Sequence, residues 1–213
     1  MNNTLNQTRT FRKVRMQNKT RTIVEIGMLG AIATVLMLFE FPLPFIAPPF
    51  YEIDLSEVPV LVGAFALGPI AGATIELIKI LINLIINGTN TAFVGEIGNY
   101  ILGCSFIIPA ALIYKLKKTK TIALAGMIIG TITMTVFGCF LNAYVLLPTY
   151  AAAFGMPIDA IVGMGSAINA NITNVMTFVV MSVAPFNMIK GVVVSVLTLL
   201  IYKHISPILK GNR

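Results

Sequence analysis

The sequence predicts an all-α integral membrane protein with six transmembrane helices. Two observations support this class: 57% of the 213 residues are hydrophobic, and only 11% are charged. Soluble domains average about 25% charged residues. The apolar runs are also long, and a spanning helix needs about 20 residues. With the polar first 20 residues and the loops set aside, residues 21–213 have room for five or six helices in a single membrane domain.

The distribution of basic residues predicts the orientation of the chain. Thirteen of the fifteen lysines and arginines lie before residue 22, in the loop 115–120, or after residue 202. Positive charge marks cytoplasmic segments, so both termini are expected in the cytoplasm, which requires an even number of crossings and favours six. Residues 1–20 are polar and aperiodic, which predicts a flexible basic arm attracted to anionic lipid rather than to nucleic acid.

Turn and apolar signals place the individual spans. The expected helices run from about 22 to 40, 58 to 67, 71 to 86, 96 to 114, 122 to 147 and 185 to 203. Prolines interrupt residues 41–59, where the partial alternation of residues 51–55 predicts a short strand or hairpin. Residues 149–184 are long for a connection and predict a capping or partly re-entrant segment. Within it, residues 175–183 either belong to the cap or extend the last helix.

Two lysines, Lys79 and Lys190, lie inside apolar segments. An ionised lysine at a helix centre costs roughly 2.5 to 3.5 kcal/mol on insertion scales, so such residues usually face protein or a cavity. Lys79 lies three residues after Glu76, and the simplest interpretation is an ion pair that holds the bundle together.

Polar residues at a common depth predict a binding pocket. At a rise of about 1.5 Å per residue, several side chains from four helices fall in the external third of the bilayer: Asn83, Asn99, Asn142, Asn187 and Lys190. Thr91, in the turn at residues 88–91, and Tyr144, near the outer end of the fifth span, join this set. Phe45 and Tyr51 belong to the loop at residues 41–59, which is either a lid over the pocket or part of an interfacial aromatic belt.

Several kinds of chemistry are absent from the sequence. There is no Walker A motif, no H-E-x-x-H and no G-x-S-x-G, and the single histidine excludes a multi-histidine metal site. No catalytic residue, metal or cofactor is therefore expected. The amides, hydroxyls and aromatic rings that remain suit the binding of neutral planar or polyhydroxylated molecules. An intramembrane enzyme and a structural assembly protein are the competing classes.

The first span carries a small-xxx-small face at Gly27 and Ala31. This spacing lets a second helix approach closely in lipid. It predicts either packing inside the bundle or contact with a partner.

Five segments together carry a resemblance to a known family. They are Phe41–Phe45, Ile53–Pro59, Gly68–Gly72, Leu141–Pro148 and Pro185–Gly191. The chain resembles the substrate-binding S components of energy-coupling factor (ECF) vitamin transporters, and most closely the riboflavin-specific members. The resemblance covers nearly everything after residue 20.

The resemblance implies a six-helix protein of the bacterial cell membrane that captures riboflavin from outside and works with a transmembrane T component and two ATPases. Asn142, Asn187 and Lys190 match positions where flavin contacts are expected, with Lys190 donating to a flavin oxygen. The first loop resembles a gate in which Phe45 or Tyr51 covers the ring, and the face at Gly27 resembles the docking surface for the T component. Another vitamin or flavin, such as FMN, folate or pantothenate, and a non-transport membrane assembly protein remain the alternatives.

Overall fold

The computed structural model describes the backbone of residues 2–89 and 91–210 and the side chains of residues 19–89 and 91–201. The basic side chains expected at the two ends of the chain lie largely outside this part. The elements in chain order are α1 (Asn2–Met37), β1 (Phe41–Pro42), β2 (Glu52–Ile53), α2 (Glu57–Leu67), α3 (Pro69–Asn87), α4 (Val94–Leu116), α5 (Lys120–Leu141), the π-helical turn η1 (Asn142–Leu146), α6 (Leu147–Phe154), α7 (Ile158–Ser166), α8 (Val175–Phe178), the π-helical turn η2 (Val179–Val183) and α9 (Ala184–Lys210).

Five helical segments of the described chain are long and apolar enough to cross a membrane. They are Lys19–Met37, Pro69–Asn87, Val94–Leu116, Lys120–Phe154 and Val175–Ile201. The second predicted span, α2, is apolar but only 11 residues long. The helical membrane class therefore agrees with the prediction, whereas the structure provides five full-length candidates and one short helix.

The short helix α2 lies at the centre of the bundle. It packs against α1, α3, α4 and α9, and most of its residues are buried. The main core gathers around it, with Leu61, Phe65, Phe106 and Met127 among its members. A helix enclosed by other helices does not need to span the bilayer by itself, because its neighbours supply the surface that contacts lipid.

Both last spans are longer than the sequence predicted. Helix α5 continues through η1 into α6, so one rod runs from Lys120 to Phe154 instead of ending near residue 147. Helices α8 and α9 join through η2, so the last rod begins at Val175 and not near Pro185. Of the two alternatives for residues 175–183, the extension of the last helix is therefore confirmed. Proline is tolerated in the first turn of a helix and does not by itself mark a start, and the apolar run before Pro185 continues the helix.

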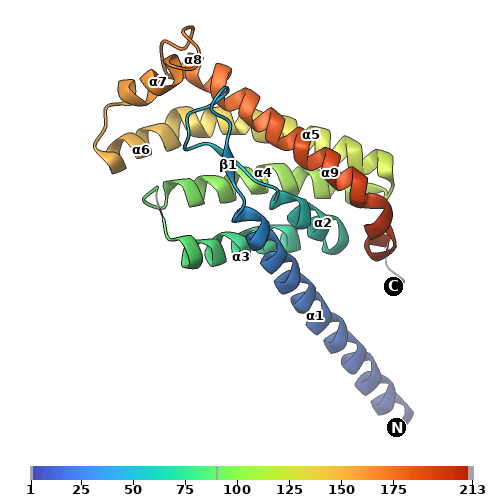
Figure 1. Cartoon of the computed structure of the whole chain (residues 1–213). Helices are drawn as coiled ribbons and strands as arrows, with labels where there is room; N and C mark the ends of the chain where they lie inside the picture. The colour runs from blue at the N-terminus through green and yellow to red at the C-terminus, as the bar shows by residue number, and fades with distance from the viewer. Residues whose placement is uncertain (1, 90, 211–213) are drawn as a thin grey trace.

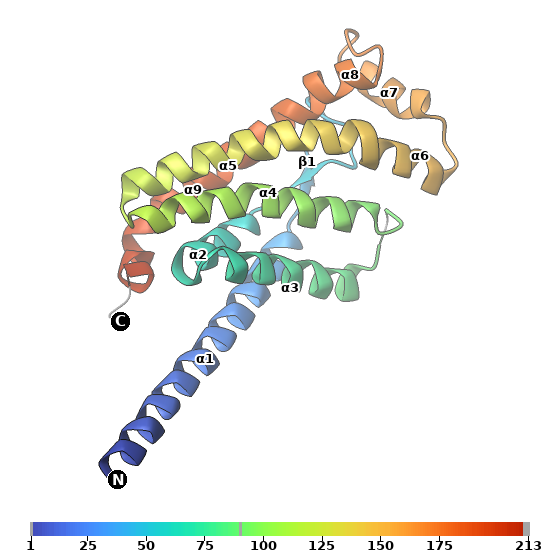
Figure 2. The ribbon, with the colours of Figure 1, turned by 180° about the vertical axis from the view of Figure 1, so that it is seen from behind.

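Helix α1 also begins earlier than predicted, at Asn2. Residues 2–20 contain neither glycine nor proline, so no strong helix breaker stops the helix of the first span from extending toward the N-terminus. This part of α1 projects away from the bundle (Figures 1 and 2).

The loop after α1 folds over one end of the bundle. Phe41 pairs with Ile53 and Pro42 pairs with Glu52 in a two-stranded antiparallel ribbon, which confirms the predicted hairpin. Helices α6, α7 and α8 form a cap at the same end, while the α4–α5 turn lies at the opposite end with the C-terminal part of α9 (Figures 1 and 2). The cap has its own apolar cluster, which includes Leu147, Ile172 and Phe178.

Candidate ligand-binding pocket

A cavity of about 370 Å³ lies between the hairpin loop and the helices. This volume is within the range of small-molecule pockets. Its lining residues come from α1, the first loop, α2, α3, α4, α5, η1, α6 and α9. The polar and aromatic members of the lining are Glu40, Phe50, Tyr51, Glu52, Glu57, Asn83, Asn87, Thr91, Glu96, Asn99, Asn142, Tyr150, Phe186, Asn187 and Lys190.

Five of these lining residues are asparagines and four are aromatic. An amide can donate and accept hydrogen bonds at the same time. The rings of Phe50 and Tyr51 lie 4.8 Å apart, and those of Tyr51 and Phe186 lie 5.5 Å apart. The cavity thus combines flat apolar walls with neutral polar groups.

Asn142 is held in place by two hydrogen bonds. Its Nδ2 donates to the carbonyl of Gly138 at 2.8 Å, and its Oδ1 accepts from the Tyr51 hydroxyl at 2.5 Å. Asn142 is the first residue of the π-helical turn η1, a type of turn that is frequent at functional sites. The Tyr51 bond therefore links the first loop directly to the end of α5.

Asn187 presents a buried donor. Its side chain lines the cavity and the residue is 3% exposed, yet Nδ2 has no hydrogen-bond partner among the described residues. A Cβ atom at Gly138 would lie 2.5 Å from this nitrogen, so the amide occupies its position only because residue 138 is glycine. A buried polar group without a partner is costly, and a ligand acceptor would satisfy it.

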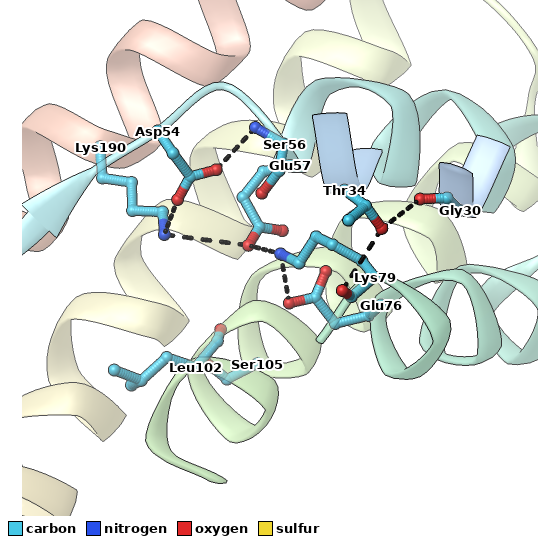
Figure 3. Close-up of polar contacts among 10 residues, drawn as sticks. All are labelled: Gly30, Thr34, Asp54, Ser56, Glu57, Glu76, Lys79, Leu102, Ser105 and Lys190. Carbon is cyan, nitrogen blue, oxygen red and sulfur yellow. Dashed lines mark hydrogen bonds and ion pairs between the residues drawn. The ribbon is translucent and has the colours of Figure 1, made fainter. Parts of the chain in front are cut away.

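Lys190, which the resemblance assigned to a ligand oxygen, is paired with carboxylates within the protein. Its Nζ lies 3.4 Å from Asp54 Oδ2 and 3.9 Å from Glu57 Oε1 (Figure 3). Asp54 also accepts a 2.7 Å hydrogen bond from the Ser56 amide. The lysine also lines the cavity. Its pairing with Asp54 therefore connects α9 to the first loop at the wall of the pocket.

The charge network continues into the core. Lys79 lies 3.0 Å from Glu57 Oε1 and 2.7 Å from Glu76 Oε1, and all three side chains are almost fully buried (Figure 3). The predicted Glu76–Lys79 pair is confirmed, but it belongs to a five-residue network with Asp54 and Lys190. Thr34 of α1 donates at 3.4 Å to the Lys79 carbonyl. The network thus joins α9, the first loop, α2 and α3.

Two further carboxyls, Glu40 and Glu52, flank the hairpin at the cavity. Burial, followed by the negative charges of Glu52 and Asp54, raises the pKa of Glu40 to about 7. Burial alone would raise the pKa of Asp54, but the Lys190 and Lys79 ammonium groups and Ser56 lower it to about 2. Asp54 is therefore ionised near neutral pH, and Glu40 changes charge there.

The Glu40 pKa predicts a pH dependence of stability. A carboxyl whose pKa is raised in the folded protein stabilises the fold at low pH, and this stabilisation is lost as the pH rises through about 7. Glu40 faces Glu52, Asp54 and, with opposite charge, Lys190. Between pH 6 and pH 8 the thermal midpoint of the wild type should fall more than that of Glu40→Gln, by a few degrees at most. Equal slopes in the two proteins would show that Glu40 is not titrating as described.

Seven of the nine predicted pocket residues line the cavity: Tyr51, Asn83, Thr91, Asn99, Asn142, Asn187 and Lys190. Asn83 accepts a hydrogen bond from Asn87, and Thr91 donates to Glu96 at 2.7 Å. These residues are brought together as the depth argument predicted, although a ligand contact for each remains a prediction.

Phe45 and Tyr144 do not line the cavity, so their predicted placement in the pocket is wrong. Tyr144 is 68% exposed and stacks near Phe140 on the outer surface. Residues two apart on a helix point to nearly opposite faces, so Tyr144 cannot share the inward face of Asn142. Phe45 is 72% exposed, and Phe50 lines the cavity in its place.

Sequence reasoning missed the acidic part of the lining. Glu40, Glu52, Glu57 and Glu96 all line the cavity, and none of the four was among the predicted pocket residues. It also missed Gly138. A glycine is needed there because the Asn187 side chain of α9 comes too close for any Cβ atom. Within the described residues, no group of three or more His, Cys, Asp or Glu side chains is arranged to hold a metal ion.

The small face of α1 is open. Gly27 and Ala31 are exposed, and a Cβ atom at Gly27 would have no neighbour within 4 Å, whereas Gly30 packs against Ile78. The interpretation of Gly27 as internal packing within the bundle is therefore wrong. The face is free for lipid or for another helix.

The fold and the cavity define a multi-pass membrane protein that binds a small molecule between its helices. The family model for the substrate-specific component of ECF transporters matches residues 21–202, and the chain belongs to this family. It is therefore a substrate-specific subunit of a transporter in the cell membrane.

Two named riboflavin transporters are similar to this chain over most of their length. The chain is 38% identical to the riboflavin transporter RibU of Staphylococcus aureus (strain TCH60), over 93% of this chain and 97% of the relative. It is 36% identical to the riboflavin transporter FmnP of Bacillus subtilis (strain 168), over 92% and 97%. A solved S component of a bacterial ECF transporter superimposes with a TM-score of 0.71 at 35% identity, covering 91% of this chain and 99% of that one.

Proposed function

We propose that this chain captures riboflavin from the external side of the membrane for ATP-driven uptake. In this role it works with a transmembrane T component and two ATPase subunits. Family membership supports the S-component role, and the names of the two relatives support riboflavin as the ligand.

The observation that most directly supports riboflavin as the ligand is that neutral amides and aromatic side chains line the same cavity. Riboflavin has a flat tricyclic ring whose edge alternates carbonyl oxygens with an imide N–H, and a chain of hydroxyls. Aromatic side chains such as Phe50 and Phe186 suit the ring faces. Amides such as Asn142 and Asn187 suit edges that both donate and accept.

Asn187 and Lys190 are proposed to donate to oxygens of the flavin. The unpartnered Nδ2 of Asn187 is the strongest support, since a ligand oxygen would satisfy it. For Lys190 the donor role is secondary to its pairing with Asp54 and Glu57. We assign it mainly to holding the first loop against α9.

The first loop is proposed to act as the gate. Tyr51 contacts Asn142 through its hydroxyl and Phe186 through its ring, so opening the loop would break contacts on two pocket walls.

For the orientation in the membrane, we propose that the short α2 counts as the sixth membrane helix, that the pocket end faces outward, and that both termini are cytoplasmic. The placement of basic residues supports this orientation.

The exposed small face at Gly27 and Ala31 is proposed to dock the T component. It is not used in packing within the bundle, and small residues favour close helix contacts in lipid.

Folate and pantothenate are disfavoured as ligands because both carry carboxylates, while four of the five charged residues that line the cavity are acidic.

Uptake in cells tests this function. A bacterium that cannot make riboflavin should grow on low riboflavin when this chain is expressed with its T component and ATPases. Growth should fail when an ATPase subunit carries an inactivating Walker A substitution. Growth that is equal without this chain would contradict the proposal, provided that the host lacks other flavin importers.

A further inference from the structure

The cap at the pocket end of the molecule is almost free of charge. Residues 147–183, which run from α6 to the end of η2, contain a single charged residue, Asp159. About a quarter of the residues in a soluble domain are charged, and the short segment 115–120 of this chain alone contains four lysines. The composition of the cap is therefore unlike that of a segment surrounded by water.

Helices α6 and α7 are apolar on both sides. Leu147 of α6 and Ile161 of α7 point into the cluster of the cap, whereas Phe154 is 47% and Met164 is 41% exposed on the opposite side. The other exposed residues of the two helices are Thr149, Ala152, Ala153, Asp159, Ala160 and Gly163. A helix with apolar residues all round lies in a protein core or in a membrane, and here one side is left without protein.

The length of the preceding rod explains how α6 reaches the membrane surface. The rod Lys120–Phe154 has 35 residues, so at about 1.5 Å per residue it is roughly 50 Å long, against about 30 Å for the hydrocarbon core. Such a mismatch is relieved by tilting or bending. The turn η1 and Pro148 lie where α5 passes into α6, and π-helical turns and prolines are common sites of bends.

The polar part of the cap is confined to one loop. Residues 167–174, between α7 and α8, contain three asparagines and one threonine, and Asn171, Thr173 and Asn174 are exposed. This loop projects from the cap beyond the helices (Figures 1 and 2). The cap thus has a polar edge suited to water and an apolar face suited to lipid.

We propose that the exposed side of α6 and α7 is embedded among the lipid acyl chains of the leaflet at the pocket end. Lipid is the occupant because this side continues the outer surface of α5, where Phe140 is 61% and Val145 is 50% exposed. Interfacial helices bury their apolar face about 5–10 Å into the boundary between headgroups and acyl chains. The proposal concerns the outer surface of the cap, goes beyond the proposed function, and holds whichever ligand the cavity binds.

Single tryptophans test this placement, because the chain contains no tryptophan of its own. Phe154→Trp and Met164→Trp are each reconstituted in phosphatidylcholine nanodiscs, with acyl chains that are either unmodified or brominated near the headgroup. The brominated lipid should remove about half of the emission of each variant, since bromine quenches on contact and the face lies at its depth. Iodide in the water should quench both only weakly.

Two further variants calibrate the readings. Phe140→Trp, on the outer surface of the spanning helix α5, gives the quenching expected for full contact with lipid. Asn171→Trp, in the polar loop, should be quenched more by iodide than by the brominated lipid. Phe154 stacks near Tyr150, which lines the cavity, whereas Met164 lies outside the described lining and gives a reading independent of the pocket.

The outcomes decide between lipid, water and protein at this face. Lipid quenching of Phe154→Trp and Met164→Trp comparable to that of Phe140→Trp supports the proposal. Strong quenching by iodide and none by brominated lipid, as in a cap that stands in water, would overturn it. Protection of both variants from both quenchers would also overturn it, because a second copy of the chain would then cover the face.

Discussion

Replacing Lys79 by methionine should lower the free energy of unfolding by about 3–5 kcal/mol. The substitution leaves two buried carboxylates short of a partner: Glu76 loses its ion pair, and Glu57 keeps only the more distant Lys190 ammonium group at 3.9 Å. Breaking a buried ion pair on one side costs about this much. The Lys79 side chain is fully buried, so water cannot replace the ammonium group without opening the core. Thermal unfolding in detergent should show a midpoint lower by roughly 10 °C.

Two comparisons isolate the charge effect. Lys120→Met removes a lysine from the exposed start of α5 and should leave the midpoint nearly unchanged. Adding Glu76→Gln to Lys79→Met removes one of the stranded charges and should restore part of the loss. A Lys79→Met midpoint equal to that of Lys120→Met would contradict the role given to the buried network.

Asn187→Leu should weaken riboflavin binding by roughly 100-fold. Leucine has a similar shape but removes the buried donor and the acceptor together, and the ligand oxygen that Nδ2 would serve is then left unpaired. An unsatisfied buried polar group costs about 1–3 kcal/mol, and each 1.4 kcal/mol is a factor of ten in affinity. Titration by quenching of riboflavin fluorescence measures this loss.

The matched control is Asn171→Leu, at an exposed asparagine outside the pocket. It should bind riboflavin as the wild type does. Asn187→Leu protein that keeps its thermal midpoint and binds riboflavin within twofold of the wild type would remove Asn187 from the binding site.

The membrane fold was predictable because its signals are local. Charge scarcity, helix-length apolar runs and proline clusters located the spans and the hairpin. The start of the last rod at Val175 was not predictable from Pro185, because proline is favoured in the first turn of a helix, and here the rod continues through a π-helical turn before it. The π-helical turns at Asn142 and Val179 likewise had no signature in the sequence.

The site was predictable in part, because the depth of a side chain in the membrane is also a local property of its own helix. The depth of Asn142, Asn187 and Lys190 follows from counting along single helices. The pairing of Lys190 with Asp54 joins residues 136 positions apart, and no periodicity within a helix reveals such a contact. Tyr144 was placed in the pocket by depth alone, whereas its direction around the helix decides its contacts.

The central claim is that the cavity of amides and aromatic rings binds riboflavin. The most direct measurement is the visible absorption spectrum of the protein purified in detergent from cells supplied with riboflavin, followed by titration of added riboflavin. We predict a yellow preparation with flavin absorption bands, or, if the ligand is lost during purification, saturable quenching at one flavin per chain. A colourless protein that leaves the fluorescence of added riboflavin unchanged would contradict the claim.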